Sequence, residues 1–118
     1  MYKASIYFIN CLASVNLEHE LMRILTIHNR YQVRGGEEEC YEAEISLLQK
    51  MGHQVEVYEE NNNSLAALNT ADLAARTVWS QKTYEYIRHC LQQQPYNVVH
   101  VHNFFPLISP SVYYATKA

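Results

Sequence analysis

The stretch Arg23-Ile-Leu-Thr-Ile-His28, followed by Asn29-Arg-Tyr-Gln-Val-Arg34-Gly35-Gly36, decides the fold. Its first half is a short apolar run rich in branched residues, which is typical of a strand buried on both faces of a parallel sheet. The polar residues and the glycine pair that follow interrupt this pattern. From Gly36 onward the apolar period becomes helical, so we expect Arg34-Gly35-Gly36 to be the turn from a buried strand into a helix.

The next segment predicts one crossover unit. Apolar residues at helical spacing form a stripe along residues 36–51, made by Tyr41, Ile45 and Leu48 and widened by Leu47 and Met51. Gly52 follows as a C-cap glycine, and the alternation in residues 54–59 predicts a second strand. Residues 23–59 therefore have the length of a right-handed parallel β-α-β crossover.

The second half of the chain repeats the alternation of helix and strand. Residues 61–64 predict a loop, and the alanine- and leucine-rich residues 65–76 predict a short helix. Ser80 is a suitable N-cap for a helix that ends near Gln93. Residues 97–102 predict a third strand, and Ser109-Pro110 is a typical helix opening. The expected fold is α/β, a Rossmann-like parallel sheet with flanking helices.

Length and composition restrict the class of protein. The chain has 118 residues, which suit one domain, and 48% of them are hydrophobic, as in a globular protein. The formal net charge of -3 gives no basic face for nucleic acid. Three widely spaced cysteines, at positions 11, 40 and 90, are expected to be reduced thiols of a cytoplasmic protein.

Both ends of the chain carry expectations about domain organisation. Residues 1–21 include an apolar stretch that is too short to span a bilayer, and the strand pattern begins just after Met22. We therefore expect residues 1–21 to be an N-terminal extension and residues 22–118 to be a partial domain. The helix opened by Ser109-Pro110 stops at Ala118, which suggests a truncation.

The carboxyl edge of the predicted sheet collects the candidate site residues. Ligands of open α/β sheets bind beyond the carboxyl ends of the strands, and two loops leave the sheet there. Glycines allow close approach of a ligand to the backbone, and a helix N-terminus favours anions. The candidates after the first strand are His28, Asn29, Arg34, Gly35 and Gly36, and those after the third strand are His102 and Asn103.

Each of these candidates also has a purely structural interpretation. The glycine pair alone is more often an ordinary tight turn, and three glutamates at positions 37–39 oppose an anion. His100 and His102 share a face of their strand. No carboxylate or cysteine stands at a matching spacing, however, so we expect no metal site. His100 is then expected to be a core residue, and His102 the one that reaches a ligand.

Five ordered segments resemble a known enzyme family. They are Met22-Arg-Ile-Leu-Thr-Ile-His-Asn, Arg34-Gly-Gly-Glu, Gly52-His-Gln-Val-Glu-Val, Asn97-Val-Val-His-Val-His-Asn and Pro106-Leu-Ile-Ser-Pro. In this order and spacing the chain resembles the start of a family 4 glycosyltransferase, over residues 22–118. The resemblance implies a truncated N-terminal domain of the GT-B architecture, in which two Rossmann-like domains enclose the active site.

The resemblance also implies a function. Members transfer a sugar from a nucleotide-diphosphate donor to a glycan or lipid acceptor, usually with retention of configuration and commonly without a metal. Gly35 and Gly36, with Arg34, would lie near the donor diphosphate. His102 would line the interdomain cleft, with His28, Asn29 and Asn103 near donor or acceptor. No catalytic residue is assigned and no cofactor is expected.

Parts of the family pattern are absent from the chain. A further histidine of the first domain and the paired glutamates of the second domain would lie beyond Ala118. The isolated chain is therefore expected to lack its C-terminal partner domain and to be inactive. A cytoplasmic location with peripheral association at the inner membrane face is the matching expectation.

Two other functions stay open. The chain could be a non-catalytic Rossmann-like or flavodoxin-like binding module, in which Gly35-Gly36 is only a turn and exposed hydrophobic residues dock a partner. A dinucleotide-binding domain is the weaker alternative, because the glycine spacing differs from G-x-G-x-x-G. Its acidic residue would be Glu59 or Glu60, at the end of the second strand.

Overall fold

The structure, a computed structural model, describes residues 20–118 apart from the side chain of Ser64. Three parallel strands form its sheet: β1 (Arg23–Arg30), β2 (Gln54–Asn61) and β3 (Val98–Asn103), in the order β2-β1-β3. The predicted extension 1–21 lies almost wholly outside the described residues. β1 starts one residue after Met22, as the apolar pattern indicates.

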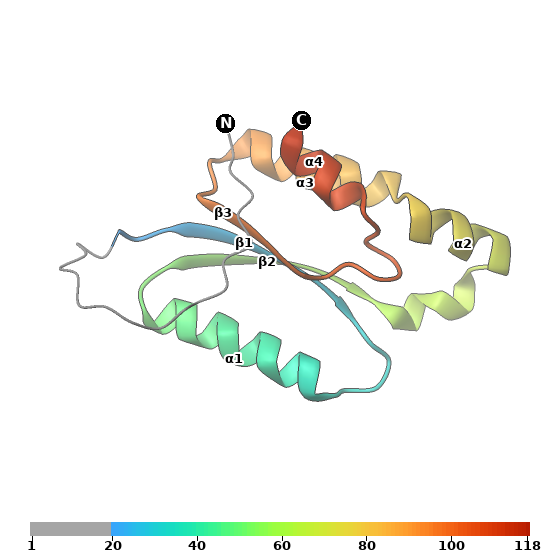
Figure 1. Ribbon diagram of the computed structural model, residues 1–118, viewed down its shortest axis with the longest axis horizontal. Coiled ribbons are helices and arrows are strands. Elements are labelled where there is room, and N and C mark those ends of the chain that lie inside the picture. The colour runs from blue at the N-terminus through green and yellow to red at the C-terminus, as the bar shows by residue number, and fades with distance from the viewer. Residues whose placement is uncertain (1–19) are drawn as a thin grey trace.

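Helices cover both faces of this sheet. α1 (Gly36–Lys50) lies on one face, whereas α3 (Gln81–Gln93) and α4 (Ser111–Lys117) lie on the other (Figure 1). A 3-10 helix, η1 (Asn62–Ala67), and α2 (Thr70–Val78) connect β2 to α3. The chain is therefore an α/β protein with a parallel sheet and flanking helices, an arrangement compatible with a Rossmann-like fold.

The central strand β1 has two different faces. Leu25 and Ile27 are buried in an apolar core with residues of α3, α4 and the neighbouring strands, and its buried members include Tyr58, Ile87, Tyr96, Ile108, Val112 and Ala115. Thr26 and His28 point to the other face, where they meet Tyr41 of α1. Because strand side chains alternate, β1 supplies an apolar layer to one side and a polar layer to the other.

Helix ends confirm several sequence predictions. Gly52 has a φ of 90° and donates its N–H to Gln49 O at 3.0 Å, as a C-terminal glycine should. Ser80 caps α3 by accepting from the N–H of Thr83. In α1, however, Leu47 and Met51 are exposed, so the prediction that they widen its packed stripe is wrong.

Two loop predictions need correction. Residues 61–64 are not a loop, because Asn61 ends β2 and η1 begins at Asn62. The last helix begins at Ser111 rather than Pro110, and Ser109 takes a φ of 67° before it. The N-cap is therefore Pro110 and not Ser109 as predicted, although the Ser109 hydroxyl accepts from the N–H of Ser111 at 3.2 Å. Within residues 20–118, no helix has the length and apolar character needed to cross a bilayer.

Candidate functional site

The strand order makes the carboxyl ends of β1 and β3 a topological switch point, and we call this edge of the sheet, with the loops that leave it, the crevice. The chain passes from β1 through α1 to β2 on one side, and then returns to β3 on the other side of β1. The chain after β1 runs to α1 on one face and the chain after β3 runs to α4 on the other, and open α/β sheets bind their ligands at such a switch point (Figure 1). Tyr31–Gly35 follows β1 and Phe104–Pro110 follows β3. All the candidate residues lie in or beside this crevice.

His28 lies beneath the crevice rather than at its surface. It is 0% exposed, and its ring stacks on Tyr41 with centroids 4.2 Å apart. Nε2 is 3.2 Å from Glu38 Oε1, yet the two atoms lack hydrogen-bond geometry. Among the described residues, neither ring nitrogen therefore has a hydrogen-bond partner. A buried unpaired polar group costs about 1–3 kcal/mol, so His28 is an unusual core residue.

Glu38 holds the loop after β1 against the first turn of α1. Its Oε2 accepts from Arg30 Nη1 at 2.9 Å, and its Oε1 accepts from the Tyr31 N–H at 3.0 Å. Arg30 also donates to Glu59 on β2, and this hydrogen bond raises the pKa of Arg30. The carboxylate beside His28 is thus fixed by two adjacent residues at the end of β1, one of which also pairs with β2.

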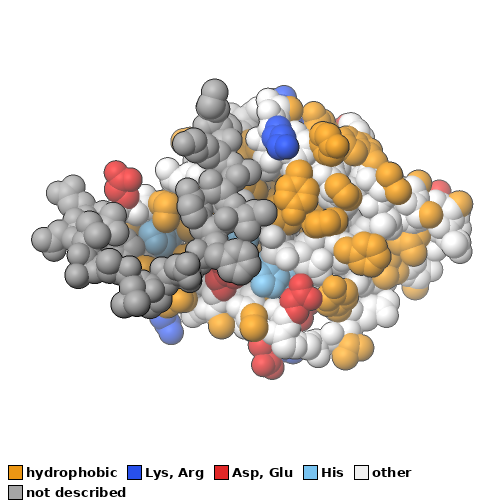
Figure 2. Space-filling model, in the orientation of Figure 1, with side chains coloured by type: hydrophobic (Ala, Val, Ile, Leu, Met, Phe, Trp, Pro, Cys, Tyr) orange, Lys and Arg blue, Asp and Glu red, His pale blue; other side chains and the backbone are white. Residues whose placement is uncertain are grey.

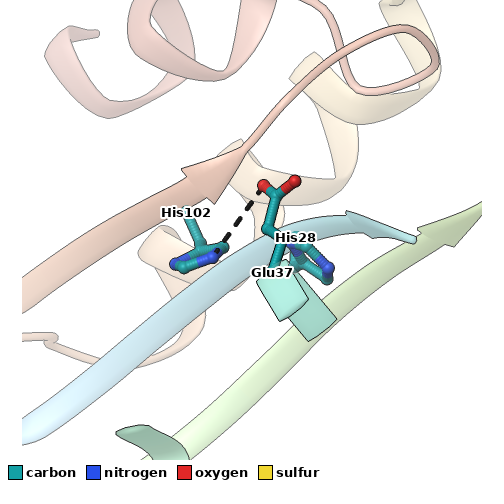
Figure 3. Close-up of side chains that lie close together, drawn as sticks. All are labelled: His28, Glu37 and His102. Carbon is teal, nitrogen blue, oxygen red and sulfur yellow. Dashed lines mark ion pairs between the residues drawn. The ribbon is translucent and has the colours of Figure 1, made fainter. Parts of the chain in front are cut away.

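His102 is the accessible partner of His28. Its side chain is 19% exposed, and the two imidazoles meet edge to face with centroids 5.1 Å apart. His102 Nε2 lies 3.9 Å from Glu37 Oε1, and Nδ1 lies 3.8 Å from Glu44 Oε2. Figure 3 shows the carboxylate of Glu37 directed toward His102, with His28 beside it. The prediction that His102 can reach a ligand fits this placement.

The sequence did not identify Glu37 and Glu44 of α1 as site residues. His100 is not a core residue as predicted: its side chain is 37% exposed, and Nδ1 lies 2.9 Å from Glu44 Oε1. Glu37, Tyr41 and Glu44 stand at positions i, i+4 and i+7, so one stripe of α1 faces the histidines. This helical spacing is the sequence feature that could have predicted a shared face for the two carboxylates. The premise that no carboxylate accompanies the H-x-H pair is wrong, because packing of α1 supplies two.

The two asparagines serve the fold. Asn29 is 0% exposed and donates Nδ2 to Asn62 Oδ1 at 2.6 Å, while its Oδ1 accepts from the Leu107 N–H at 2.9 Å. Asn103 donates Nδ2 to Asn29 O and accepts from the Phe105 N–H. The two side chains tie the end of β1 to η1 and to the loop after β3, so they position the site rather than face a ligand.

Gly35 and Gly36 lie between β1 and α1, as predicted, but they do not form a turn that requires glycine. Gly35 is the N-cap of α1 in extended backbone, with no side-chain cap. The positive φ among the described glycines belongs to Gly52, and a Cβ on Gly35 or Gly36 would meet nothing within 4 Å. The prediction that a tight turn requires these glycines is therefore wrong. Gly35 occupies the N-cap, a position that favours glycine, whereas neither backbone conformation nor packing explains Gly36.

Arg34 points to α1 rather than to the crevice. Its Nη1 and Nη2 donate to the two carboxylate oxygens of Glu42 at 2.9 and 2.7 Å. This pairing lowers the pKa of Glu42 and raises that of Arg34. The pair is solvent-exposed and therefore contributes little to stability, which leaves Arg34 free to exchange partners.

Comparison of the chain with protein-family models, with curated proteins and with solved structures finds no match.

Proposed function

We propose that the chain is the N-terminal part of a nucleotide-sugar-dependent, retaining glycosyltransferase. In this proposal the donor diphosphate lies against Gly35 and Gly36, and a glycan or lipid acceptor approaches His102 across the cleft. The observation that carries it is the glycine pair in the switch-point loop: two exposed glycines that the folded chain itself does not require. Close approach of a ligand to the backbone is a physical reason for an open glycine at position 36 beside the N-cap Gly35.

The start of α1 supports an anion at this position. Its first turn has no side-chain cap, so backbone N–H groups and the positive end of the helix dipole face the loop. Glu38 does not compete strongly, because its carboxylate is already bound by Arg30 and the Tyr31 N–H. The carboxylate of Glu37 does compete with an anionic ligand for the start of α1, because it is partly exposed beside His102.

The remaining predicted residues take supporting roles in this proposal. His102 would contact donor or acceptor directly. His28, Asn29 and Asn103 would position the two loops from below, since the first two are fully buried and Asn103 bonds to the Asn29 carbonyl. Because an interdomain cleft needs both of its walls to orient the reactants, the isolated chain is expected to bind the donor weakly and to transfer no sugar.

A titration followed by amide NMR tests this proposal. We expect uridine diphosphate glucose, guanosine diphosphate mannose or inorganic pyrophosphate to shift the amide signals of Gly35 and Gly36 at about millimolar concentration, a free energy near -4 kcal/mol. Gly36→Ala should abolish the shifts by placing a methyl group in the path of the phosphate. Ser46→Ala, an exposed change further along α1, is the matched control. Shifts that persist in Gly36→Ala, or none with any probe, would contradict the proposal.

A non-catalytic binding module is the second candidate, favoured by a different observation. Trp79, Phe105 and Tyr114 are exposed, and Trp79 contacts Tyr114 with ring centroids 5.6 Å apart. Figure 2 shows hydrophobic side chains gathered over the part of the molecule that holds the later helices. Under this alternative none of the three phosphate probes shifts the glycine amides, whereas a protein partner broadens the signals of these aromatic residues.

A further inference from the structure

Three side chains from three separate elements converge below the crevice. His28 of β1, Glu37 of α1 and His102 of β3 each offer one ligand atom, and these atoms all lie within 4.8 Å of one another (Figure 3). We propose that these residues bind a divalent transition-metal ion of the Zn²⁺ type. Two imidazoles and one carboxylate are a common ligand set for an accessible metal site with three protein ligands.

The strongest support comes from His28. A fully buried imidazole that has no hydrogen-bond partner among the described residues is rare in folded proteins, and the contact of Nε2 with Glu38 Oε1 at 3.2 Å compensates the desolvation only in part. A metal ion binds the lone pair of a neutral imidazole and so compensates that cost. Stacking on Tyr41 holds the ring in place, with the planes inclined by 27°.

The separations suit such an ion after small side-chain rotations. Zn²⁺ binds nitrogen and oxygen at about 2.0–2.2 Å, so two ligands of a tetrahedral ion lie about 3.4 Å apart. His102 Nε2 and Glu37 Oε1 are already 3.9 Å apart. The side chains of Glu37 and His102 are 38% and 19% exposed, so solvent reaches this side of the buried His28. An ion there would keep one position for water or an external ligand.

A second triplet competes for the same histidine. Glu44, His100 and His102 also bring ligand atoms within 4.8 Å. However, His100 Nδ1 and Glu44 Oε1 already pair at 2.9 Å. Glu44 Oε2 instead lies 3.8 Å from His102 Nδ1, on the opposite nitrogen from Glu37. Glu44 is therefore placed to orient His102, as carboxylates behind metal-bound histidines commonly do.

The metal site stands on its own geometry and does not depend on the proposed function. It does bear on one difficulty of that function, because Glu37 brings negative charge to the place proposed for a diphosphate. A divalent cation on Glu37 would offset this charge and offer its open position to a phosphate oxygen. If the chain bound no nucleotide, the proposed metal site would not be contradicted, because it is tested with Zn²⁺ alone.

Zn²⁺ affinity of the full chain tests the proposal. The protein is treated with a chelator, kept reduced and titrated with Zn²⁺ in competition with a chromophoric chelator. We expect one ion per chain with micromolar or tighter affinity. Co²⁺ should give an absorption spectrum of nitrogen and oxygen ligands without thiolate charge transfer, which separates this site from binding at the cysteines.

Variants assign the ligands. Glu37→Gln and His102→Ala should each weaken Zn²⁺ binding by more than about tenfold, which is the loss expected even for supporting residues of a metal site. His89→Ala, an exposed histidine on α3, should leave the affinity unchanged. Glu37→Gln keeps the side-chain shape and lies at the surface, so it tests the site even if a His28 variant fails to fold.

Three results would overturn the proposal. The first is binding no tighter than millimolar. The second is a Co²⁺ spectrum with thiolate charge transfer. The third is a large loss in Glu44→Gln and His100→Ala with none in Glu37→Gln, which would assign the ion to the other triplet.

Discussion

At the scale of single residues, the Asn29 amide joins three segments that are distant in sequence. It binds Asn62 of η1 through Nδ2 and the backbone N–H of Leu107 through Oδ1, in a fully buried position. Asn29→Ala would leave two buried groups unpaired, so we expect the free energy of unfolding to fall by about 2–4 kcal/mol. Urea denaturation followed by circular dichroism measures this loss.

An exposed asparagine gives the matched control for that measurement. Asn63→Ala on the surface of η1 should change the free energy of unfolding by less than about 0.5 kcal/mol. Equal stabilities of the two variants would mean that the Asn29 hydrogen bonds do not hold η1 and the loop after β3 to β1. A large effect in Asn29→Ala together with unchanged Zn²⁺ stoichiometry at low denaturant would confirm its purely structural role.

At the scale of elements, the fold requires a glycine after the end of α1 but not at its start. Gly52 has a φ of 90°, and a Cβ there would lie 3.0 Å from Leu21 Cδ2, whereas Gly36 has open space around it. Gly52→Ala should destabilise the protein by about 1–2 kcal/mol, mainly through backbone strain. Gly36→Ala, at the first helical position, should leave stability unchanged or raise it by up to about 1 kcal/mol. Guanidinium denaturation of both variants measures the difference.

The same pair separates folding from ligand binding. If Gly36→Ala destabilised the protein as much as Gly52→Ala, the glycine at position 36 would be explained by the fold, and the observation behind the proposed function would be lost. A stable Gly36→Ala variant that no longer binds phosphate ligands would instead place the role of that glycine in binding.

Local sequence patterns predict the strands and helices but not the contacts between them. The apolar run of β1, the Ser80 cap and the alternation of β3 predict the strands and α3 well, because each depends on nearby residues alone. Alternation likewise places His100 and His102 on one face. The carboxylates opposite them depend on where α1 packs across the sheet, which is a long-range contact. The carboxylates of Glu37 and Glu44 therefore could not be assigned to these histidines from spacing along one strand.

At the scale of the whole molecule, three buried tyrosines make stability depend on alkaline pH. Burial raises the pKa of Tyr41, Tyr58 and Tyr96 to about 12 each, from an ordinary value near 10. They lie on both sides of the sheet, since Tyr41 belongs to α1 whereas Tyr58 and Tyr96 belong to the core beside α3 and α4. All three hydroxyls are therefore neutral in the folded protein well above neutral pH.

A raised folded-state pKa favours the protonated form in the native state. The contribution is fully present below pH 10 and is lost as the pH rises from about 10 toward 12, because the unfolded chain ionises first. Each tyrosine that is ionised only in the unfolded chain lowers the free energy of unfolding by at most about 1.4 kcal/mol per pH unit. Urea denaturation at pH 8, where none of the effect has appeared, and at about pH 11 measures the combined loss.

Tyr58→Phe isolates one contribution to this alkaline loss. Its hydroxyl donates to Glu60 at 3.0 Å and lies 3.4 Å from Thr83 Oγ1. The variant is expected to be less stable at neutral pH but to lose less free energy of unfolding between about pH 8 and 11, because one titrating group is gone. Tyr31→Phe, at an exposed residue of the crevice loop, should keep the wild-type pH dependence. An unchanged alkaline slope in Tyr58→Phe would show that this hydroxyl titrates alike in the folded and unfolded chain, and that the core beside α3 does not protect it.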